Sequence, residues 1–357
     1  MMRKSIIKLF TCTLAIMLCG CSSGQNDIKQ FEFNNFSKFS KDSNNIINGS
    51  LIYKDNENYY FQSPVDETLW YSNNCFKTKN RLGRLDEAVF HITIVDKTIY
   101  YFAINRDTDF TVTYLGDRNP YGGAICELNM KTNEIKELKR FKSGQIGNLI
   151  VDNQWIYYSI FGNCTGVYRF NSETNDSEKL IQFSPDNLVL ADNALVYLQG
   201  GKIMAYDLET RTSGVLYKIP LSRNEEINNF IVHDDCIYYF IELFSGNKIT
   251  TKTVQYNVSA KQSSQICSMD YSVEAATIYG NKIIYLSSNS MHNEKFDAIR
   301  IVNIDDGTLV REVKQTAIGD GLFIFDNELY FYLYEFEKAP SIVRINLDSQ
   351  DFASEKL

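Results

Sequence analysis

One six-residue pattern recurs seven times in this chain of 357 residues, and a long-period repeat restricts the architecture more than any other feature. Each copy has an Asn or Asp, two variable residues, a large apolar or aromatic residue, a tyrosine and a second large apolar residue. The copies begin at Asn56, Asp96, Asn153, Asn193, Asp234, Asn281 and Asp326. The first and last copies start 270 residues apart over six intervals, so the mean period is 45 residues. An apolar stretch precedes each copy, and Asn and Asp suit tight turns, so each copy is expected to form a β-hairpin.

A second strand pattern, which ends in Asn or Asp before a polar turn, follows most of these hairpins. It ends at Asn129, Asn171, Asp207, Asn257, Asn303 and Asn346, with a weak version at Asn73. Two hairpins per repeat give four strands, and strands that are apolar on both faces belong to sheets covered from both sides. Such units are typical of a β-propeller. The sequence predicts an all-β propeller of four-stranded blades, with seven blades and with six or eight as the alternatives. A β-sandwich of ordinary hairpins is the competing interpretation, which the regular spacing disfavours.

The strand pairing carries a family resemblance. A Tyr-Tyr strand, as at Tyr157-Tyr158, is followed by a Val-Tyr-Arg-Phe-Asn strand at residues 167–171. This pairing resembles clostridial-type lipoprotein propellers, a bacterial family of unknown function whose repeats are similar to the YWTD propellers of low-density lipoprotein receptors. The resemblance covers residues 48–357 and implies the fold. The YWTD tetrapeptide is absent here, so the resemblance implies no ligand, and YWTD propellers have six blades where this chain has seven copies.

The N-terminus has the features of an export signal. Basic residues precede an apolar stretch, residues 9–18, which is shorter than the roughly 20 residues of a membrane-spanning helix. The run Leu18-Cys19-Gly20-Cys21 resembles the lipobox of bacterial lipoproteins. That resemblance implies a signal peptide at residues 1–20, acylation of Cys21 and a lipid-anchored protein on the extracytoplasmic face of the cell membrane. An ordinary secretory signal with a chance cysteine is the alternative.

Residues 21–45 are then expected to form the lipidated cysteine and a polar tether, and residues 46–357 the propeller domain. Four phenylalanines make the tether more apolar than a simple linker: Phe31, Phe33, Phe36 and Phe39. Part of it is therefore expected to dock as an edge strand and close the ring against the last blade.

Charge and cysteine content limit the partners. The net charge is −8, and removal of residues 1–20, which hold three basic and no acidic side chains, leaves −11. An acidic surface disfavours nucleic acid and anionic lipid, so the acyl chains on Cys21 are expected to supply membrane attachment.

Five further cysteines remain in the mature chain, at positions 75, 126, 164, 236 and 267. Their odd number and irregular spacing favour buried thiols, with one disulfide as the alternative.

The second repeat holds the longest insertion. Its two patterns lie 33 residues apart, from Asp96 to Asn129, whereas 18 residues separate Asn153 from Asn171. The extra residues fall within 105–123, on the face expected to lie opposite the Asn/Asp turns. The candidate binding residues in this loop are Arg106, Asp107, Asp109, Asp117, Arg118 and Tyr121. Tyr and Arg favour contact surfaces. A solvated hairpin is one alternative, and a calcium site at the three aspartates is another, although no EF-hand loop is present. No other cofactor or metal is expected.

The sequence lacks the common catalytic motifs. Its histidines, His91, His233 and His292, are not at ligand spacing, and no HExxH, GxSxG, P-loop or GxGxxG motif occurs. We expect no catalytic residues. The favoured hypothesis is a non-catalytic binding or scaffold module for a protein, peptide or glycan. The alternatives are a carbohydrate-active or other hydrolytic propeller enzyme that uses rim carboxylates, and a structural or sensor component of an envelope complex.

Overall fold

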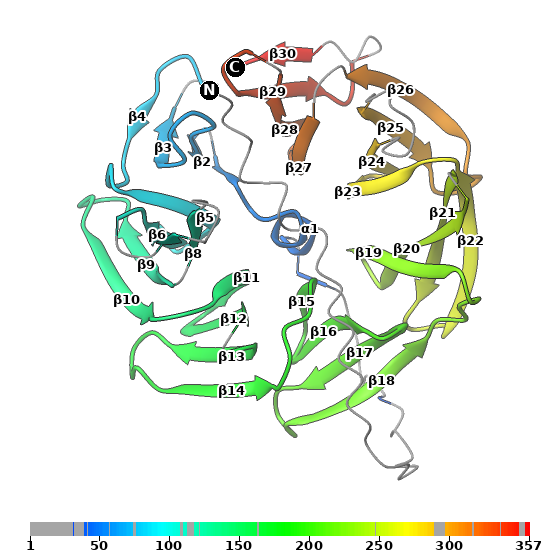
Figure 1. Ribbon diagram of the computed structural model, residues 1–357, viewed down its shortest axis with the longest axis horizontal. Coiled ribbons are helices and arrows are strands. Elements are labelled where there is room, and N and C mark those ends of the chain that lie inside the picture. The colour runs from blue at the N-terminus through cyan, green and yellow to red at the C-terminus, as the bar shows by residue number, and fades with distance from the viewer. Residues whose placement is uncertain are drawn as a thin grey trace.

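Seven four-stranded antiparallel sheets surround a central channel in the computed structural model, as Figure 1 shows. The predicted seven-bladed propeller is therefore confirmed. The structure describes residues 31, 39–40, 42–56, 58–73, 76–107, 110–112, 118–120, 122–162, 164–246, 248–288, 297–315, 318–335, 337–349 and 354–357.

Each blade runs from an inner strand at the channel to an outer strand at the perimeter, and the blades are numbered in chain order. Blade 1 comprises β1 (Ile52–Asp55), β2 (Asn58–Gln62), β3 (Leu69–Ser72) and β4 (Asn80–Arg81). Blade 2 comprises β5 (Glu87–Val95), β6 (Thr98–Asn105), β9 (Gly123–Asn129) and β10 (Ile135–Phe141). Blade 3 comprises β11 (Gln145–Asp152), β12 (Trp155–Phe161), β13 (Gly166–Asn171) and β14 (Ser177–Ile181). Blade 4 comprises β15 (Leu188–Ala191), β16 (Ala194–Gln199), β17 (Lys202–Asp207) and β18 (Thr212–Lys218).

Blade 5 comprises β19 (Glu225–His233), β20 (Cys236–Ser245), β21 (Lys248–Asn257) and β22 (Gln262–Met269). Blade 6 comprises β23 (Ser272–Tyr279), β24 (Lys282–Ser288), β25 (Asp297–Asn303) and β26 (Leu309–Gln315). Blade 7 comprises β27 (Ile318–Phe325), β28 (Glu328–Tyr334), β29 (Ser341–Asn346) and β30 (Ser354–Lys356). A small hairpin of β7 (Phe110–Val112) and β8 (Arg118–Pro120) is inserted into blade 2. The described residues form one helix, α1 (Ser43–Ile47), which lies at the centre of the ring (Figure 1).

The repeated Asn or Asp forms the turn between the first and second strands of each blade. The residue that opens this turn has a φ between +47° and +56° in all seven blades: Asn56, Asp96, Asn153, Asp192, Asp234, Gly280 and Asp326. Asn, Asp and Gly adopt this left-handed conformation at the least cost. In blades 4 and 6 the turn opens one residue earlier than the sequence pattern indicated.

The second pattern forms the turn between the third and fourth strands. In blade 3 the Asn171 side chain accepts hydrogen bonds from the amides of Glu173 and Thr174. The amide of Ser172 donates to the carbonyl of Gln154 in the first turn, at 2.9 Å. The same bond between the two turns recurs in blades 2 and 4 to 7. The two kinds of turn therefore share one face of the ring, called here the marker face, and the opposite face is called the loop face.

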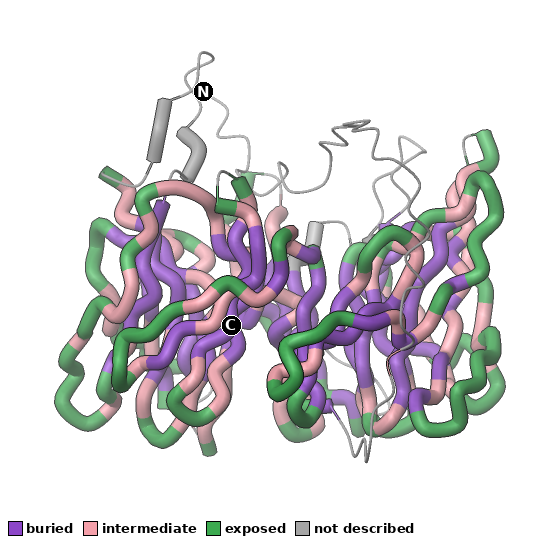
Figure 2. Tube along the Cα trace, turned by 90° about the horizontal axis from the view of Figure 1, so that it is seen from below, coloured by how far each residue is buried: buried purple, intermediate pink, exposed green. Residues whose placement is uncertain are grey.

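The recurring tyrosines explain the buried core between neighbouring blades. Six of the seven are at most 5% exposed: Tyr60, Tyr157, Tyr197, Tyr238, Tyr285 and Tyr330. Figure 2 shows that buried residues fill the middle of each blade and that the exposed ones lie at turns and outer strands. A buried tyrosine needs a partner for its hydroxyl. Between blades 5 and 6, the hydroxyls of Tyr285 and Thr253 lie 2.9 Å apart.

Side-chain packing between blades 7 and 1 closes the ring. The Tyr330 hydroxyl donates to that of Tyr59 at 3.0 Å, and the Tyr332 hydroxyl donates to the carbonyl of Gln62 at 2.6 Å. The outer strand of blade 7 is the C-terminal β30. The N-terminal segment pairs elsewhere, because Phe39 forms a β-bridge with Ala191 of blade 4. The expectation that this segment completes the last blade is therefore wrong for the described residues; Phe33 and Phe36 lie outside them.

The cysteine prediction is confirmed in part. Residues 126, 164, 236 and 267 are free thiols, whereas Cys75 lies outside the described residues. Cys126 and Cys236 are buried as expected, but Cys164 is exposed. Within the described part of the chain, no helix is both long and apolar enough to cross a membrane.

Candidate functional site: the occupied central channel

The centre of the ring is filled by the chain itself. The channel segment, defined here as the described residues of 39–50, includes α1 and belongs to no blade. The helix contacts the inner strands of five blades, β11, β15, β19, β23 and β27. Figure 1 shows α1 enclosed by these strands. The expected tether thus contributes Phe39, Ser40 and residues 42–45 to the folded ring.

Asn44 holds the segment to blade 5. Its side-chain amide donates to the carbonyl of Val232 at 2.9 Å, and its oxygen accepts from the amide of Val232 at 2.9 Å. An inner strand has one edge without a neighbouring strand, so its outward N–H and C=O groups need partners. The Asn side chain carries one acceptor and two donors and can pair with both groups. Asn44 therefore takes the place of a neighbouring strand at Val232.

Other edge groups bond to the backbone and side chains of the segment. The amides of Phe39 and Ser40 donate to the carbonyls of Asp234 and Leu190, at 3.3 and 3.2 Å. The Asn48 side chain donates to the carbonyl of Ala276 at 2.9 Å. The amide of Ile92 donates to the carbonyl of Ser50 at 2.7 Å. The segment thus satisfies backbone groups of blades 2, 4, 5 and 6.

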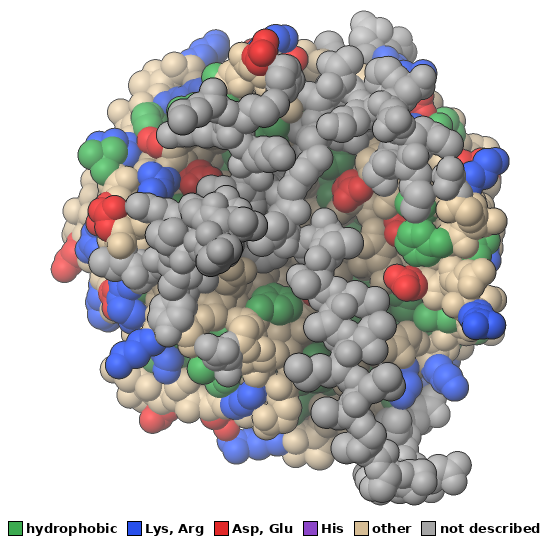
Figure 3. All heavy atoms as spheres, in the orientation of Figure 1, with side chains coloured by type: hydrophobic (Ala, Val, Ile, Leu, Met, Phe, Trp, Pro, Cys, Tyr) green, Lys and Arg blue, Asp and Glu red, His purple; other side chains and the backbone are tan. Residues whose placement is uncertain are grey.

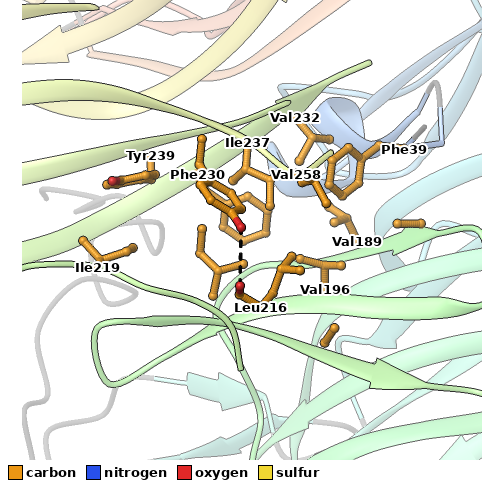
Figure 4. Packing of buried hydrophobic residues seen from close by; sticks show 14 of the residues in the cluster. Phe39, Val189, Val196, Leu216, Ile219, Phe230, Val232, Ile237, Tyr239 and Val258 are labelled. Carbon is orange, nitrogen blue, oxygen red and sulfur yellow. Dashed lines mark hydrogen bonds between the residues drawn. The ribbon is translucent and has the colours of Figure 1, made fainter. Parts of the chain in front are cut away.

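Apolar contacts complete the seal. The Phe39 side chain is 5% exposed and lies against Val189 and Val232, as Figure 4 shows. On the other side of the channel, Gly321 has a φ of +63°, and a Cβ there would clash with the ring of Phe323 and lie 3.2 Å from the carbonyl oxygen of Asn48. Glycine at this position lets the backbone of blade 7 approach the end of α1.

A cavity of about 280 Å³ remains between the segment and the marker-face ends of three inner strands. The segment contributes Phe39, Ser40, Asp42 and Ile46 to its lining. Blades 2, 3 and 4 contribute Thr93, Val95, Ile150, Val151, Asp152, Leu190 and Asp192. The floor is apolar and buried, whereas three carboxylates lie around it. Burial and the neighbouring Asp42 raise the pKa of Tyr53, whose hydroxyl donates to that carboxylate at 3.2 Å.

A buried carboxylate joins blades 5 and 6 near the loop face. Glu242 is 7% exposed and accepts hydrogen bonds from the Ser272 hydroxyl at 2.5 Å, the Val273 amide at 3.3 Å and the Asn228 side chain at 3.2 Å. Burial raises the pKa of Glu242 above its ordinary value, although these hydrogen bonds act in the opposite direction. All three donors lie within the ring, so Glu242 of blade 5 is linked to Ser272 and Val273 of blade 6.

Two other polar side chains that resemble catalytic groups are also enclosed. Arg300 is 4% exposed, its guanidinium carbon lies 3.4 Å from the ring centroid of Tyr271, and its Nε donates to Glu312 at 2.9 Å. His91 lies at a bulge of β5 with a φ of +55°. Burial lowers the pKa of His91 to about 4, so the imidazole is neutral at physiological pH. Its Nδ1 is buried without a hydrogen-bond partner among the described residues.

The predicted binding loop is described only in part. Arg106 does not project from it, because its guanidinium donates to the backbone carbonyls of Leu85 and Asp66 and lies 3.6 Å from the Glu67 carboxylate. Asp107 is exposed. Asp109, Asp117 and Tyr121 lie outside the described residues, and Arg118 is described only as backbone of β8. The loop thus places Arg106 between blades 1 and 2, where it connects their loops.

The described part of the chain contains no group of three or more His, Cys, Asp or Glu side chains that could hold a metal ion. On the face seen in Figure 3, Lys and Arg side chains lie mostly at the perimeter, and several Asp and Glu side chains lie nearer the middle. The sequence patterns did not indicate the channel segment or the cavity. The pair Asn44 and Asn48, one helical turn apart, is the local signal that could have identified the segment.

Comparison with known proteins supports the fold. No protein-family model and no curated protein matches the sequence. A structure from a study of two prolyl endopeptidases aligns over 90% of this chain with a TM-score of 0.61 and 10% identity. The alignment covers 50% of that protein, so this chain spans half its length.

Two further structures align less well. TolB from Acinetobacter baumannii aligns over 72% of this chain and 62% of the TolB chain, with 12% identity and a TM-score of 0.43. An oligogalacturonate lyase in complex with manganese aligns over 84% of this chain and 76% of the lyase chain, with 10% identity and a TM-score of 0.42. Together with the sheet topology, the first similarity establishes that this chain is a seven-bladed β-propeller.

Proposed function

We propose that this chain is a lipid-anchored, extracytoplasmic propeller that binds a protein, peptide or glycan and catalyses no reaction. The observation that carries the proposal is the occupied channel, whose polar edge groups bond to residues 39–50 of the same chain. A ring with a filled centre offers its two faces and its rim to other molecules. Such surfaces on a rigid scaffold are common binding sites.

The buried ionisable groups support a role without catalysis. Glu242 accepts three hydrogen bonds from its own ring, and Arg300 pairs with Glu312 under the ring of Tyr271. A general acid or base must reach a bound substrate. Both side chains are engaged by their neighbours, so their arrangement favours a structural role.

The test follows binding and turnover together. The chain without its signal peptide and Cys21, residues 22–357, is incubated with a panel of short peptides and cell-wall glycan fragments. Calorimetry measures binding, and mass spectrometry measures whether each compound is recovered intact. The proposal expects saturable binding of at least one class without cleavage. Cleaved products that increase with protein concentration would contradict it and favour a hydrolytic enzyme.

Lipid attachment is the second part of the proposal, and it is supported by the lipobox-like run around Cys21. The chain would then belong with the clostridial-type lipoprotein propellers that its repeats resemble. In cell fractionation, Cys21→Ala is expected to leave the membrane fraction. Cys19→Ala is the matched control, because it removes a thiol from the same run and should leave attachment unchanged. Membrane retention of the Cys21→Ala protein would contradict lipid anchoring.

A further inference from the structure

We infer that the outer strands β18 and β22, on the perimeter of blades 4 and 5, form the surface of this protein that faces the lipid membrane. The inference rests on the proposed lipid attachment at Cys21 and names the part of the ring that this anchor holds against the membrane. Three observations support it: the place where the N-terminal segment meets the ring, the length of chain before that place, and the charge of the outer strands.

Phe31 is the most N-terminal residue that the structure describes, and it lies at blade 4. Its amide donates to the carbonyl of Val215 in β18 at 2.9 Å, and its side chain packs against the apolar core between blades 4 and 5. Phe39, the next described residue, bridges to Ala191 of the same blade. Within the described residues, the chain therefore meets the ring at the outer strand of blade 4 before it enters the channel.

The length of chain before Phe31 limits where the lipid can lie. Cys21 and Phe31 are ten positions apart, and an extended chain spans at most about 3.6 Å per residue, so the two residues lie within about 36 Å of each other. A compact domain of about 300 residues has a radius of gyration of about 19 Å and a width of about 50 Å. Blade 1 lies across the ring from blades 4 and 5 (Figure 1). The anchor therefore holds the side of blades 4 and 5 nearer to the membrane than blade 1.

The outer strands of blades 4 and 5 carry almost no charge. β18 has one charged residue, Lys218, and β22 has none. In the outer strands of the other five blades, at least two residues in every five are charged. A surface without carboxylates is not repelled by anionic lipid, and the exposed Lys218 is attracted to it.

The exposed side chains of these two strands can form hydrogen bonds with lipid headgroups. They carry hydroxyl or amide groups and include Thr212, Ser213, Gln262, Ser263, Ser264 and Gln265. Such groups donate to phosphate oxygens and accept from headgroup hydroxyls without burying a charge. The hydroxyls of Tyr217 and Ser263 lie 2.9 Å apart and join β18 and β22 into one surface.

The adjoining marker face is less suited to lipid. Its turns in blades 4 and 5 carry the exposed Asp192 and Asp234, which an anionic membrane repels. With the perimeter of blades 4 and 5 at the membrane, the ring stands on edge and both of its faces stay open to a binding partner. The acyl chains supply the attachment, and the two strands set the orientation.

Photo-cross-linking of the full-length, acylated protein tests this orientation. The photoreactive residue p-benzoylphenylalanine replaces Ser264 of β22, and in the matched control it replaces Ser354 of β30, since both are exposed serines of outer strands. Each protein is reconstituted through its acyl chains onto vesicles of phosphatidylglycerol and phosphatidylcholine and is then irradiated. Mass spectrometry measures the fraction that gains one phospholipid. We expect about fivefold more phospholipid adduct from position 264, because the short anchor holds that side of the ring at the lipid.

Isosteric charges test the chemistry of the surface. Gln262→Glu with Gln265→Glu is expected to lower the adduct from position 264 about tenfold, because anionic lipid repels carboxylates. The control, Asn80→Asp with Gln154→Glu, adds two charges at exposed positions of blades 1 and 3 and should leave the adduct unchanged. Thr212 of β18 is a second cross-linking position, which keeps the test available if the β22 variants do not fold.

Two results would overturn the inference in protein that stays bound to vesicles. They are an adduct from position 354 that equals or exceeds the one from position 264, and an adduct that the two glutamates leave unchanged. Either result would leave the lipid attachment intact. The mass of the purified wild-type protein reports its acyl group, and a protein without that group would contradict both the attachment and the orientation. The failure of this inference is therefore distinguishable from the failure of the proposed function.

Discussion

Substitution of Asn44 by alanine tests how strongly the channel segment is held. The variant loses two hydrogen bonds of 2.9 Å to Val232, each with a net value of about 1 kcal/mol. It also leaves the N–H and C=O of Val232 without their partner, and an unsatisfied buried group costs about 1–3 kcal/mol unless water enters. We therefore expect a loss of about 2–4 kcal/mol in the free energy of unfolding.

Scanning calorimetry of the mature chain measures this loss. Unfolding entropy is about 2.1 cal/mol/K per residue, or about 0.6 kcal/mol/K for a domain of roughly 300 residues. The expected fall in Tm is therefore about 3–6 °C. Asn224→Ala is the matched control, because Asn224 is exposed in the link between blades 4 and 5 and should cost less than about 0.5 kcal/mol. Equal midpoints for the two variants would refute the reasoning.

A second substitution at the same position separates the donor from the acceptor. Asn44→Asp keeps an acceptor for the Val232 amide but places a carboxylate oxygen against the Val232 carbonyl. At neutral pH this variant is expected to have a lower Tm than Asn44→Ala, because the two oxygens repel each other. Protonation restores a donor, so the deficit should shrink as the pH falls through the range of the introduced carboxyl. A deficit independent of pH would contradict the assigned pairing.

Three further predictions concern the ring. Burial raises the pKa of Glu242, so the stability that this side chain contributes is complete below its unfolded pKa and is lost as the pH rises through its folded pKa. In urea titrations between pH 4 and pH 7, the free energy of unfolding of Glu242→Gln should therefore fall less than that of the wild type. Identical pH profiles for the two proteins would contradict this. Tyr332→Phe removes the hydroxyl bonded to Gln62 across the ring closure and should cost about 1–2 kcal/mol in the same titration, and a neutral effect would contradict the closure described. A chain that ends at Thr316 lacks blade 7 and should show no cooperative unfolding by circular dichroism, so a cooperative transition would refute the need for all seven blades.

The blades could be predicted because their information is local. A turn such as the one at Asn153 needs an Asn, Asp or Gly for its positive φ, and the strands on either side follow directly in the chain. The tyrosine of each copy is large enough to fill the space between two blades, as Tyr157 does between blades 3 and 4. Local signals of this kind recur with the period of the fold, so seven copies gave seven blades.

The channel segment could not be predicted because its partners are distant. Asn44 bonds to a residue 188 positions away, and Asn48 to one 228 positions away. Residues 42–48 resemble a polar linker until the ring surrounds them. The cavity depends on the same long-range closure, since Asp152 and Asp192 meet Asp42 only when three blades and the segment are in place. The contacts of Arg106 are also long-range, because its guanidinium bonds to the backbone carbonyls of Leu85 and Asp66, which are 21 and 40 positions away.

The most direct test of the occupied channel is amide hydrogen exchange at Val232. This amide donates to the Asn44 side chain, whereas neighbouring amides of β19 donate within their sheet. The structure predicts slow exchange at Val232 in the wild type and at least tenfold faster exchange in Asn44→Ala, with the β19–β20 ladder amides little changed. Fast exchange at Val232 in the wild type, or protection that survives the loss of the Asn44 side chain, would contradict a channel sealed by the chain's own N-terminal segment.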